Sequence, residues 1–135
     1  MGLQFKRKCA MSGIDFLADT NAIIYLLSGK SYMKQYEDAR LGVSVITEME
    51  LLSFPRITPT ELSNLKALLS DCIIFPLDTA VKDRTIHIRR TYGTKLPDSI
   101  VAATSLECVV PLITADKGFK KILELDLRLL EPEEQ

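Results

Sequence analysis

The sequence has few of the residues that build disulfide frameworks and zinc sites. Its 135 residues include three cysteines, one histidine and no tryptophan. The cysteines, Cys9, Cys72 and Cys108, lie far apart and show no paired spacing. An odd, scattered set excludes a disulfide framework and a zinc knuckle, and it is typical of reduced cysteines in a cytoplasmic protein.

The sequence also lacks a long apolar run and an excess of either charge. The N-terminal stretch carries the basic cluster Lys6-Arg7-Lys8 but no apolar segment of signal-peptide or membrane-helix length, so we expect no membrane association. The formal net charge is −1. Composition therefore gives no global reason to expect nucleic acid, and any polyanion site must be a local patch.

Apolar runs and amphipathic segments alternate along the chain, which is typical of an α/β domain with a parallel sheet. We expect strands at 14–18, 41–46, 72–77, 109–113 and 127–130. We expect helices over about 21–29, 32–39, 47–54, 60–69, 81–92, 97–108 and 116–123, with Gly29 and Gly93 as terminators. Residues 1–13 are assigned to an N-terminal extension and 14–135 to a single domain. The pattern predicts a twisted sheet of about five strands flanked by helices.

Four acidic residues occupy corresponding places in this pattern. Asp19 follows the first predicted strand and Asp116 follows the fourth. Asp98 lies in the first turn of the helix opened by Pro97, and Glu50 in the first turn or so of the helix after the second strand. Carboxyl ends of parallel strands and the starts of the following helices share one edge of a sheet. We therefore expect the four acids to converge there.

Each acid alone is a favourable helix cap, worth about 0.3–1 kcal/mol. Together the carboxylates repel one another, and a divalent cation offsets that repulsion. Mg²⁺ prefers oxygen ligands and keeps several waters, whereas zinc is disfavoured because neither histidine nor cysteine adjoins these acids. Thr20, Ser99 and Thr114 are candidates to hydrogen-bond and orient the carboxylates, with capping or packing as the alternative.

Four segments carry the most specific pattern in the chain. They are Asp19-Thr20-Asn21, residues 44–47 (SVIT) followed by Glu50-Leu51, residues 96–104 (LPDSIVAAT) and residues 112–119 (LITADKGF). In order and spacing they resemble the PIN-domain family, most closely the VapC-type toxins of toxin–antitoxin pairs. The likeness extends from about residue 14 to the C-terminus.

The resemblance implies a PIN fold, a three-layer α/β/α arrangement, and an endoribonuclease that uses one or two Mg²⁺ or Mn²⁺ ions. It carries the metal-binding and catalytic roles onto Asp19, Asp98, Asp116 and Glu50, the last directly or through water. Thr114 and Asn21 match supporting positions of the family. The resemblance also implies a cytoplasmic protein with a cognate antitoxin and a homodimeric state.

Glu48 lies near the second motif but fits its spacing less well than Glu50. On an ideal helix the two side chains point about 200° apart, so we expect only one of them to reach a shared metal.

Basic residues near the predicted site are candidate contacts for RNA phosphates. Lys82 and Arg89 share one face of the helix before Asp98, and Arg84 shares another with His87. The further candidates are Arg90, Lys95, Lys117, Lys120 and Lys121. A solvated surface charge is the alternative for each, and we do not expect His87 to act as a general base.

Apolar residues of the early helices are candidates for a groove that receives the antitoxin, with a core position as the alternative for each. They are Ile23, Ile24, Leu26, Leu27, Leu51 and Leu52.

Other functions are compatible with a similar sheet. A non-enzymatic receiver-like module also binds Mg²⁺, but it needs an early acidic pair and an Asp closing the third strand. Here that strand ends in Pro76-Leu77-Asp78 and no early acidic pair exists. A haloacid-dehalogenase-type phosphatase requires a second Asp where Asn21 stands. A PIN nuclease that is not a toxin stays open.

Overall fold

The computed structural model describes residues 13–132. Nearly all of the expected N-terminal extension lies outside those residues, including Cys9 and the basic cluster Lys6-Arg7-Lys8. Within the described part of the chain, no helix has both the length and the apolar character needed to cross a membrane.

Five short strands form one parallel sheet in the order β3-β2-β1-β4-β5. They are β1 (Phe16–Ala18), β2 (Leu41–Ser44), β3 (Ile73–Phe75), β4 (Leu112–Thr114) and β5 (Leu127–Leu129). The strand order reverses at β1, because the chain proceeds outward to β3 on one side and returns to β4 on the other. Open α/β sheets bind ligands at such a reversal, beyond the carboxyl ends of the strands.

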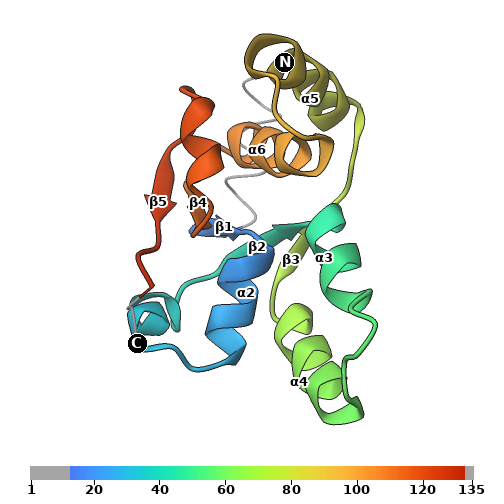
Figure 1. The fold of residues 1–135 in the computed structure, drawn as a ribbon, viewed down its shortest axis with the longest axis vertical. Coiled ribbons are helices and arrows are strands. Elements are labelled where there is room, and N and C mark those ends of the chain that lie inside the picture. The colour runs from blue at the N-terminus through green and yellow to red at the C-terminus, as the bar shows by residue number, and fades with distance from the viewer. Residues whose placement is uncertain (1–12, 133–135) are drawn as a thin grey trace.

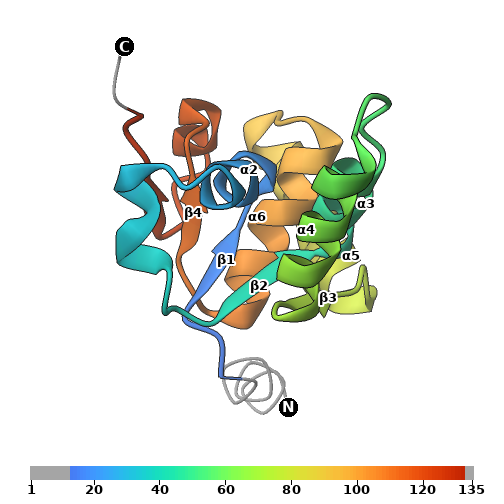
Figure 2. The same ribbon diagram turned by 90° about the horizontal axis from the view of Figure 1, so that it is seen from below.

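Helices cover both faces of the sheet (Figure 1). One face carries α5 (Thr79–Tyr92) and α6 (Leu96–Cys108). The other carries α2 (Thr20–Leu27), α4 (Pro59–Ser70) and the 3-10 helix η1 (Ser31–Tyr36), and α3 (Val45–Leu52) follows β2. Figure 2 shows α2 and α4 in front of the strands and α6 behind them. The expected three-layer α/β/α fold with a parallel sheet is confirmed.

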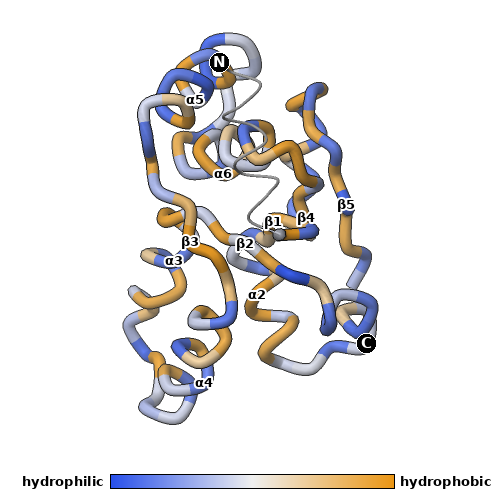
Figure 3. The backbone as a smooth tube through the Cα atoms, turned by 180° about the vertical axis from the view of Figure 1, so that it is seen from behind, coloured by the Kyte–Doolittle hydropathy of each residue, from blue (hydrophilic) through white to orange (hydrophobic). Residues whose placement is uncertain are grey.

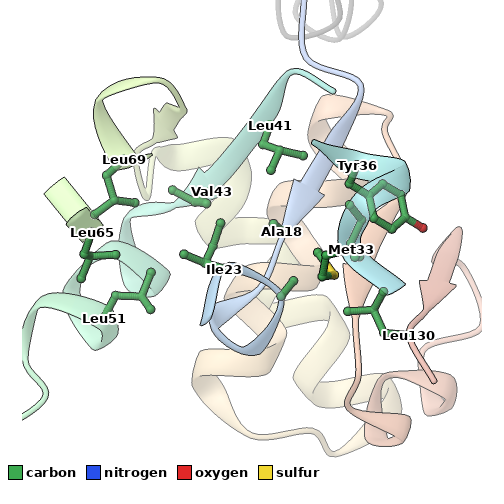
Figure 4. Packing of buried hydrophobic residues seen from close by; sticks show 12 residues of the cluster. Ala18, Ile23, Met33, Tyr36, Leu41, Val43, Leu51, Leu65, Leu69 and Leu130 are labelled. Carbon is green, nitrogen blue, oxygen red and sulfur yellow. The ribbon is translucent and has the colours of Figure 1, made fainter. Parts of the chain in front are cut away.

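Two apolar clusters fill the space between the layers, because successive strand residues point to opposite faces. Leu17 and Leu112 pack against α5 and α6, whereas Ala18 and Ile113 pack against α2 and η1. In Figure 4, Ile23 of α2 lies beside Val43 of β2 within the second cluster. Figure 3 shows that the outer helix α5 is mostly hydrophilic and that α6, which lies between α5 and the sheet, is more apolar.

The second strand ends earlier than predicted. The expected strand at 41–46 is wrong for Val45 and Ile46, which begin α3. Ser44 is the reason, because its hydroxyl accepts a hydrogen bond from the backbone N–H of Ile46 (3.2 Å) and so starts a helix despite the β-branched residues. Glu50 consequently lies in the second turn of α3 and not in its first.

Other boundaries are partly right. The segments expected as helices at 32–39 and 116–123 are the shorter 3-10 helices η1 and η2 (Lys117–Lys121). Gly29 and Gly93 follow α2 and α5 with φ of 68° each, which confirms both as helix terminators.

The fourth strand begins at Leu112, three residues later than expected. Val109 has φ of 56° and closes α6 in the left-handed conformation, with its N–H donating to the carbonyl of Leu106 (3.2 Å). Glycine is the usual residue at this position, since a β-branched side chain is strained there.

We expect Val109→Gly to raise the free energy of unfolding by about 1 kcal/mol, because the left-handed conformation costs a non-glycine residue about 1–2 kcal/mol. The side chain of Val109 is 61% exposed, so little packing is lost. Urea unfolding measures the change. Val110→Gly is the matched control and should destabilise, because Val110 has no positive φ. Equal destabilisation by both substitutions would contradict the strain argument.

Candidate functional site

A cleft of about 210 Å³ opens at the carboxyl ends of β1 and β4, and its lining includes Asp19, Glu50, Asp98 and Asp116. The four acids come from four separate segments. Asp19 stands between β1 and α2 and Asp116 follows β4, while Glu50 and Asp98 come from α3 and α6. The structure therefore brings together the acids that the sequence places at one sheet edge. Their roles as metal ligands stay a prediction.

Asp19 is the most buried of these acids, with 6% exposure. One carboxylate oxygen accepts a hydrogen bond from the backbone N–H of Ala22 (2.9 Å) and so caps α2. The other accepts one from the hydroxyl of Thr114. The pKa of Asp19 is raised to about 6, mainly by burial; the hydrogen bonds from Thr114 and Ala22 oppose the rise, and the negative charges of Asp116 and Asp98 add to it.

Thr114 connects Asp19 to Asp116. Its side chain is fully buried at the end of β4, and its hydroxyl also accepts a hydrogen bond from the backbone N–H of Asp116 (3.0 Å). The carboxylate of Asp116 in turn accepts from the N–H of Gly118 (2.8 Å) and caps η2. Thr114 thus contacts a carboxylate as expected, and Asp116 keeps an exposed side chain at the cleft.

Glu50 and Asp98 face the cleft from the two other helices. The hydroxyl of Thr20 donates to the Glu50 carboxylate (2.7 Å), so Thr20 also contacts an acid as expected. Burial raises the pKa of Asp98, the charges of Asp116 and Glu50 add to the rise, and Lys95 opposes it. Glu48 does not line the cleft, which favours Glu50 as the acid of the second motif.

The expectation that Ser99 orients a carboxylate is wrong. Ser99 is fully buried, and its hydroxyl donates to the carbonyl of Lys95 (2.7 Å) beside the hydroxyl of Thr94 (2.6 Å). A serine has one proton to donate, and a carboxylate accepts only, so the hydroxyl fixes the loop before α6. Thr94 carries no sequence signal of this role. Asn21 lines the cleft with an exposed side chain.

No lysine or arginine of the described residues lines the cleft. Arg84 pairs with Glu107, which is 8% exposed, through an Nε–Oε2 contact of 2.5 Å. The expected phosphate contact by Arg84 is incompatible with this geometry, because its departure would leave a buried carboxylate unpaired. Arg89 donates to the carbonyl of Thr94 (3.2 Å). The remaining candidates are exposed but lie outside the cleft lining, namely Lys82, Arg90, Lys95, Lys117, Lys120 and Lys121.

The only histidine lies away from the cleft lining. The side chain of His87 is 60% exposed, and its Nε2 lies 3.8 Å from the carboxylate of Glu124. His87 therefore does not line the cleft, and the expectation that it is not a general base stays a prediction.

The donor chemistry of the cleft fits a hard divalent cation. All four acids supply oxygen, and neither histidine nor cysteine lines the cleft. The pKa of Asp19 is raised mainly by burial and to a lesser extent by the charges of Asp116 and Asp98, and a bound cation would stabilise its charged form. Among residues 13–132, no three acid, histidine or cysteine side chains lie close enough to ligate one ion directly. Mg²⁺ is compatible with this arrangement, since it keeps several waters in its shell and needs few direct protein ligands.

A larger groove of about 510 Å³ adjoins the cleft between α2, α3 and α4. Its apolar lining consists of Ile24, Leu27, Leu51, Phe54, Ile57 and Leu65, with Pro55 beside them. Three of the candidate residues, Ile24, Leu27 and Leu51, therefore line a groove, and its role in receiving an antitoxin stays a prediction. Ile23 is instead fully buried in the core, and Leu26 and Leu52 do not line the groove. Phe54 lines both the groove and the acidic cleft.

The comparisons with known proteins point to one family. The sequence profile of the PIN domain matches residues 16–125. No curated protein matches the sequence.

Among solved structures, the chain is similar to one from a toxin–antitoxin complex of Klebsiella pneumoniae, with 31% identity and a TM-score of 0.69 over 78% of this chain and 90% of that one. It is also similar to a chain of VapBC2 from Rickettsia felis bound to a DNA fragment from its promoter, with 20% identity and a TM-score of 0.76 over 87% of this chain and 100% of that one. For VapBC-1 from nontypeable Haemophilus influenzae the identity is 20% and the TM-score 0.71, over 86% and 98% of the two chains. The last two show the shared fold.

The buried carboxylate predicts a pH dependence of stability in the metal-free protein. The pKa of Asp19 is about 6 in the fold against 3.8 for the ordinary group. Because the pKa of Asp19 is higher in the folded state, protonated Asp19 contributes its full stabilisation below about pH 4. This contribution to the free energy of unfolding is lost as the pH rises through 6. We expect Asp19→Asn to raise the free energy of unfolding by up to about 3 kcal/mol at pH 7.5 and little at pH 4.

Urea unfolding in EDTA across this pH range measures the effect. The matched control is Asp78→Asn, because Asp78 caps α5 through the N–H of Val81 (2.9 Å) but lies outside the cleft lining. For Asp78→Asn, the free energy of unfolding should show no increase over the wild type that grows with pH. A loss of stability in Asp19→Asn at pH 7.5 would contradict the electrostatic argument.

Proposed function

This chain belongs to the PIN domain family, and from that membership and its acidic cleft we propose that it is a metal-dependent endoribonuclease acting as the toxin of a toxin–antitoxin pair. The observation that supports the proposal most is the convergence of four carboxylates from separate segments at the reversal point of the sheet. We assign residues 14–135 to a single PIN domain that works in the cytoplasm.

In this proposal Asp19, Asp98 and Asp116 hold one or two Mg²⁺ or Mn²⁺ ions, and Glu50 contributes directly or through water. The bound ion would lower the pKa of a water and stabilise charge on the phosphodiester. Thr114 and the N–H of Ala22 fix both oxygens of Asp19. The hydroxyl of Thr20, at the start of α2, donates a hydrogen bond to the Glu50 carboxylate and so orients it.

The receiver-like alternative is disfavoured by the residue that follows the third strand. Asp78 stands where such a module would need its phosphoacceptor, but its carboxylate caps α5 and does not line the acidic cleft. A PIN nuclease that is not a toxin would differ from the proposed protein in its partner, so the partner experiment below separates the two.

We expect Asp98→Asn and Asp19→Asn each to reduce Mg²⁺-dependent cleavage of single-stranded RNA by about 100-fold or more, since each removes a proposed ligand. Glu50→Gln should impair cleavage far more than Glu48→Gln. A gel assay with and without EDTA measures the activity, and circular dichroism confirms folding.

Asp83→Asn is the matched control for cleavage, because Asp83 is an exposed acid of α5 outside the cleft lining. Its activity should equal that of the wild type. Retained cleavage in both Asp98→Asn and Asp19→Asn would exclude the proposed metal site.

The apolar groove beside the cleft is our proposed seat for a segment of the antitoxin. An apolar lining suits an amphipathic segment, and the likeness to a chain of the toxin–antitoxin complex from Klebsiella pneumoniae supports a partner of this kind. A homodimer is a further part of the proposal. Lys82, Arg90, Lys95 and Lys117 stay candidate contacts for RNA outside the cleft.

We expect Leu27→Glu to abolish copurification with the product of the adjoining antitoxin gene, because Leu27 is 40% exposed and lines the groove. Leu77→Glu is the matched control, since Leu77 is 49% exposed but lies outside the groove lining. Coexpression with a tagged partner measures binding, and RNA cleavage by Leu27→Glu shows that the fold is intact. An undiminished complex would exclude the groove as the seat.

A further inference from the structure

The walls of the acidic cleft offer an RNA chain little electrostatic attraction of their own. Its described lining holds four carboxylates and no lysine or arginine. A phosphodiester is itself negative, so these walls repel it wherever no cation lies between. An uncharged side chain that contacts the base and not the phosphate avoids this repulsion.

Phe54 is the one apolar residue of the cleft with a large exposed surface. The lining also includes Val101 and Phe119, which are 4% and 2% exposed and belong to the core. Pro97 is half-buried at the start of α6. The side chain of Phe54 is 42% exposed, and it stands four residues after Glu50, just beyond the end of α3. An aromatic ring thus lies open at the edge of the acidic cleft.

We propose that Phe54 is a base-stacking residue, which receives an unpaired nucleobase of the RNA next to the phosphodiester at the acids. This inference rests on the proposed ribonuclease function and deepens it by naming the substrate feature recognised. Every base has a π-face, so an aromatic ring stacks on any of them. Bases within a duplex are already stacked, so the ring selects single strands, loops and bulges.

The polar surroundings of Phe54 support a nucleotide at this position. Arg56 stands two residues further along the chain and lines the adjoining groove, which Phe54 also borders. The groove on this side of Phe54 therefore contains the cation Arg56 together with one acid, Glu61. Arg56 does not line the acidic cleft, so it is a candidate contact for a flanking phosphate away from the four carboxylates.

Three substitutions of Phe54 separate stacking from mere bulk. Phe54→Leu keeps an apolar side chain without a ring, Phe54→Ala removes both, and Phe54→Trp keeps an aromatic face. We expect Phe54→Leu and Phe54→Ala to raise KM for a single-stranded RNA by about 10-fold or more, with a smaller change in kcat. Phe54→Trp should stay near the wild-type values. An RNA hairpin with its cleavage site paired should be a poor substrate for every variant.

Leu52→Ala is the matched control, because Leu52 is a 38% exposed residue of α3 that lines neither cavity. A binding measurement runs in parallel in the Asp98→Asn background, with RNA that carries 2-aminopurine. Stacking quenches its fluorescence, so we expect quenching with Phe54 or Trp at this position and little with Leu. Unfolding midpoints show that each variant is folded.

Each outcome supports or overturns the inference. If Phe54→Leu keeps the wild-type KM and the wild-type quenching, the stacking proposal is overturned. The nuclease proposal still stands in that case, provided that the wild-type protein cleaves RNA. Unchanged KM together with lost antitoxin binding assigns the ring to the protein partner instead, and also overturns stacking. Absence of RNA cleavage by the wild-type protein overturns the nuclease proposal, and the stacking proposal with it.

Discussion

The hydrogen bond from the Thr114 hydroxyl to the Asp19 carboxylate joins the ends of two adjacent strands across 95 positions of sequence. Asp19 is 6% exposed, and its pKa is raised to about 6, mainly by burial. A carboxylate without hydrogen-bond partners would therefore be costly to bury here. The same hydroxyl accepts from the N–H of Asp116. Two of the four acids are therefore positioned by one buried threonine at the reversal point of the sheet.

The four acids differ in how firmly the fold holds them. Both oxygens of Asp19 are engaged in a buried position, whereas Glu50 and Asp116 are exposed. Asp98 depends on the start of α6, which has no side-chain cap of its own and is held through Ser99 and the preceding loop. One fixed carboxylate with adjustable neighbours would suit the proposed ion, since Mg²⁺ exchanges waters for protein oxygens.

Positions at the ends of strands could be predicted from the sequence, because the parallel arrangement alone sends them to a common edge. The shared position of Asp19 and Asp116 follows from that rule. Gly29 and Gly93 could be predicted as helix terminators for a different reason, because glycine readily adopts the positive φ found there. Strand propensity gives the wrong boundary at Ser44 and at Val109. Ser44 caps α3 and so makes the β-branched residues after it helical, and Val109 closes α6 in the left-handed conformation where a strand is expected. The Arg84–Glu107 pair depends on the packing of α5 against α6, which no local pattern encodes. Ser99 instead bonds locally, to the carbonyl four residues earlier and to Thr94 in the preceding loop.

Phe54 connects the two cavities of the molecule, because α3 is only eight residues long and its last turn is followed at once by this ring. A ligand of the apolar groove and a ligand of the acidic cleft therefore meet the same side chain. If RNA and a protein partner both use the ring, they exclude one another at that residue without any change of fold. By linkage, each then weakens the binding of the other by the same factor. Control of the proposed nuclease would in that case need no residue of the proposed metal site.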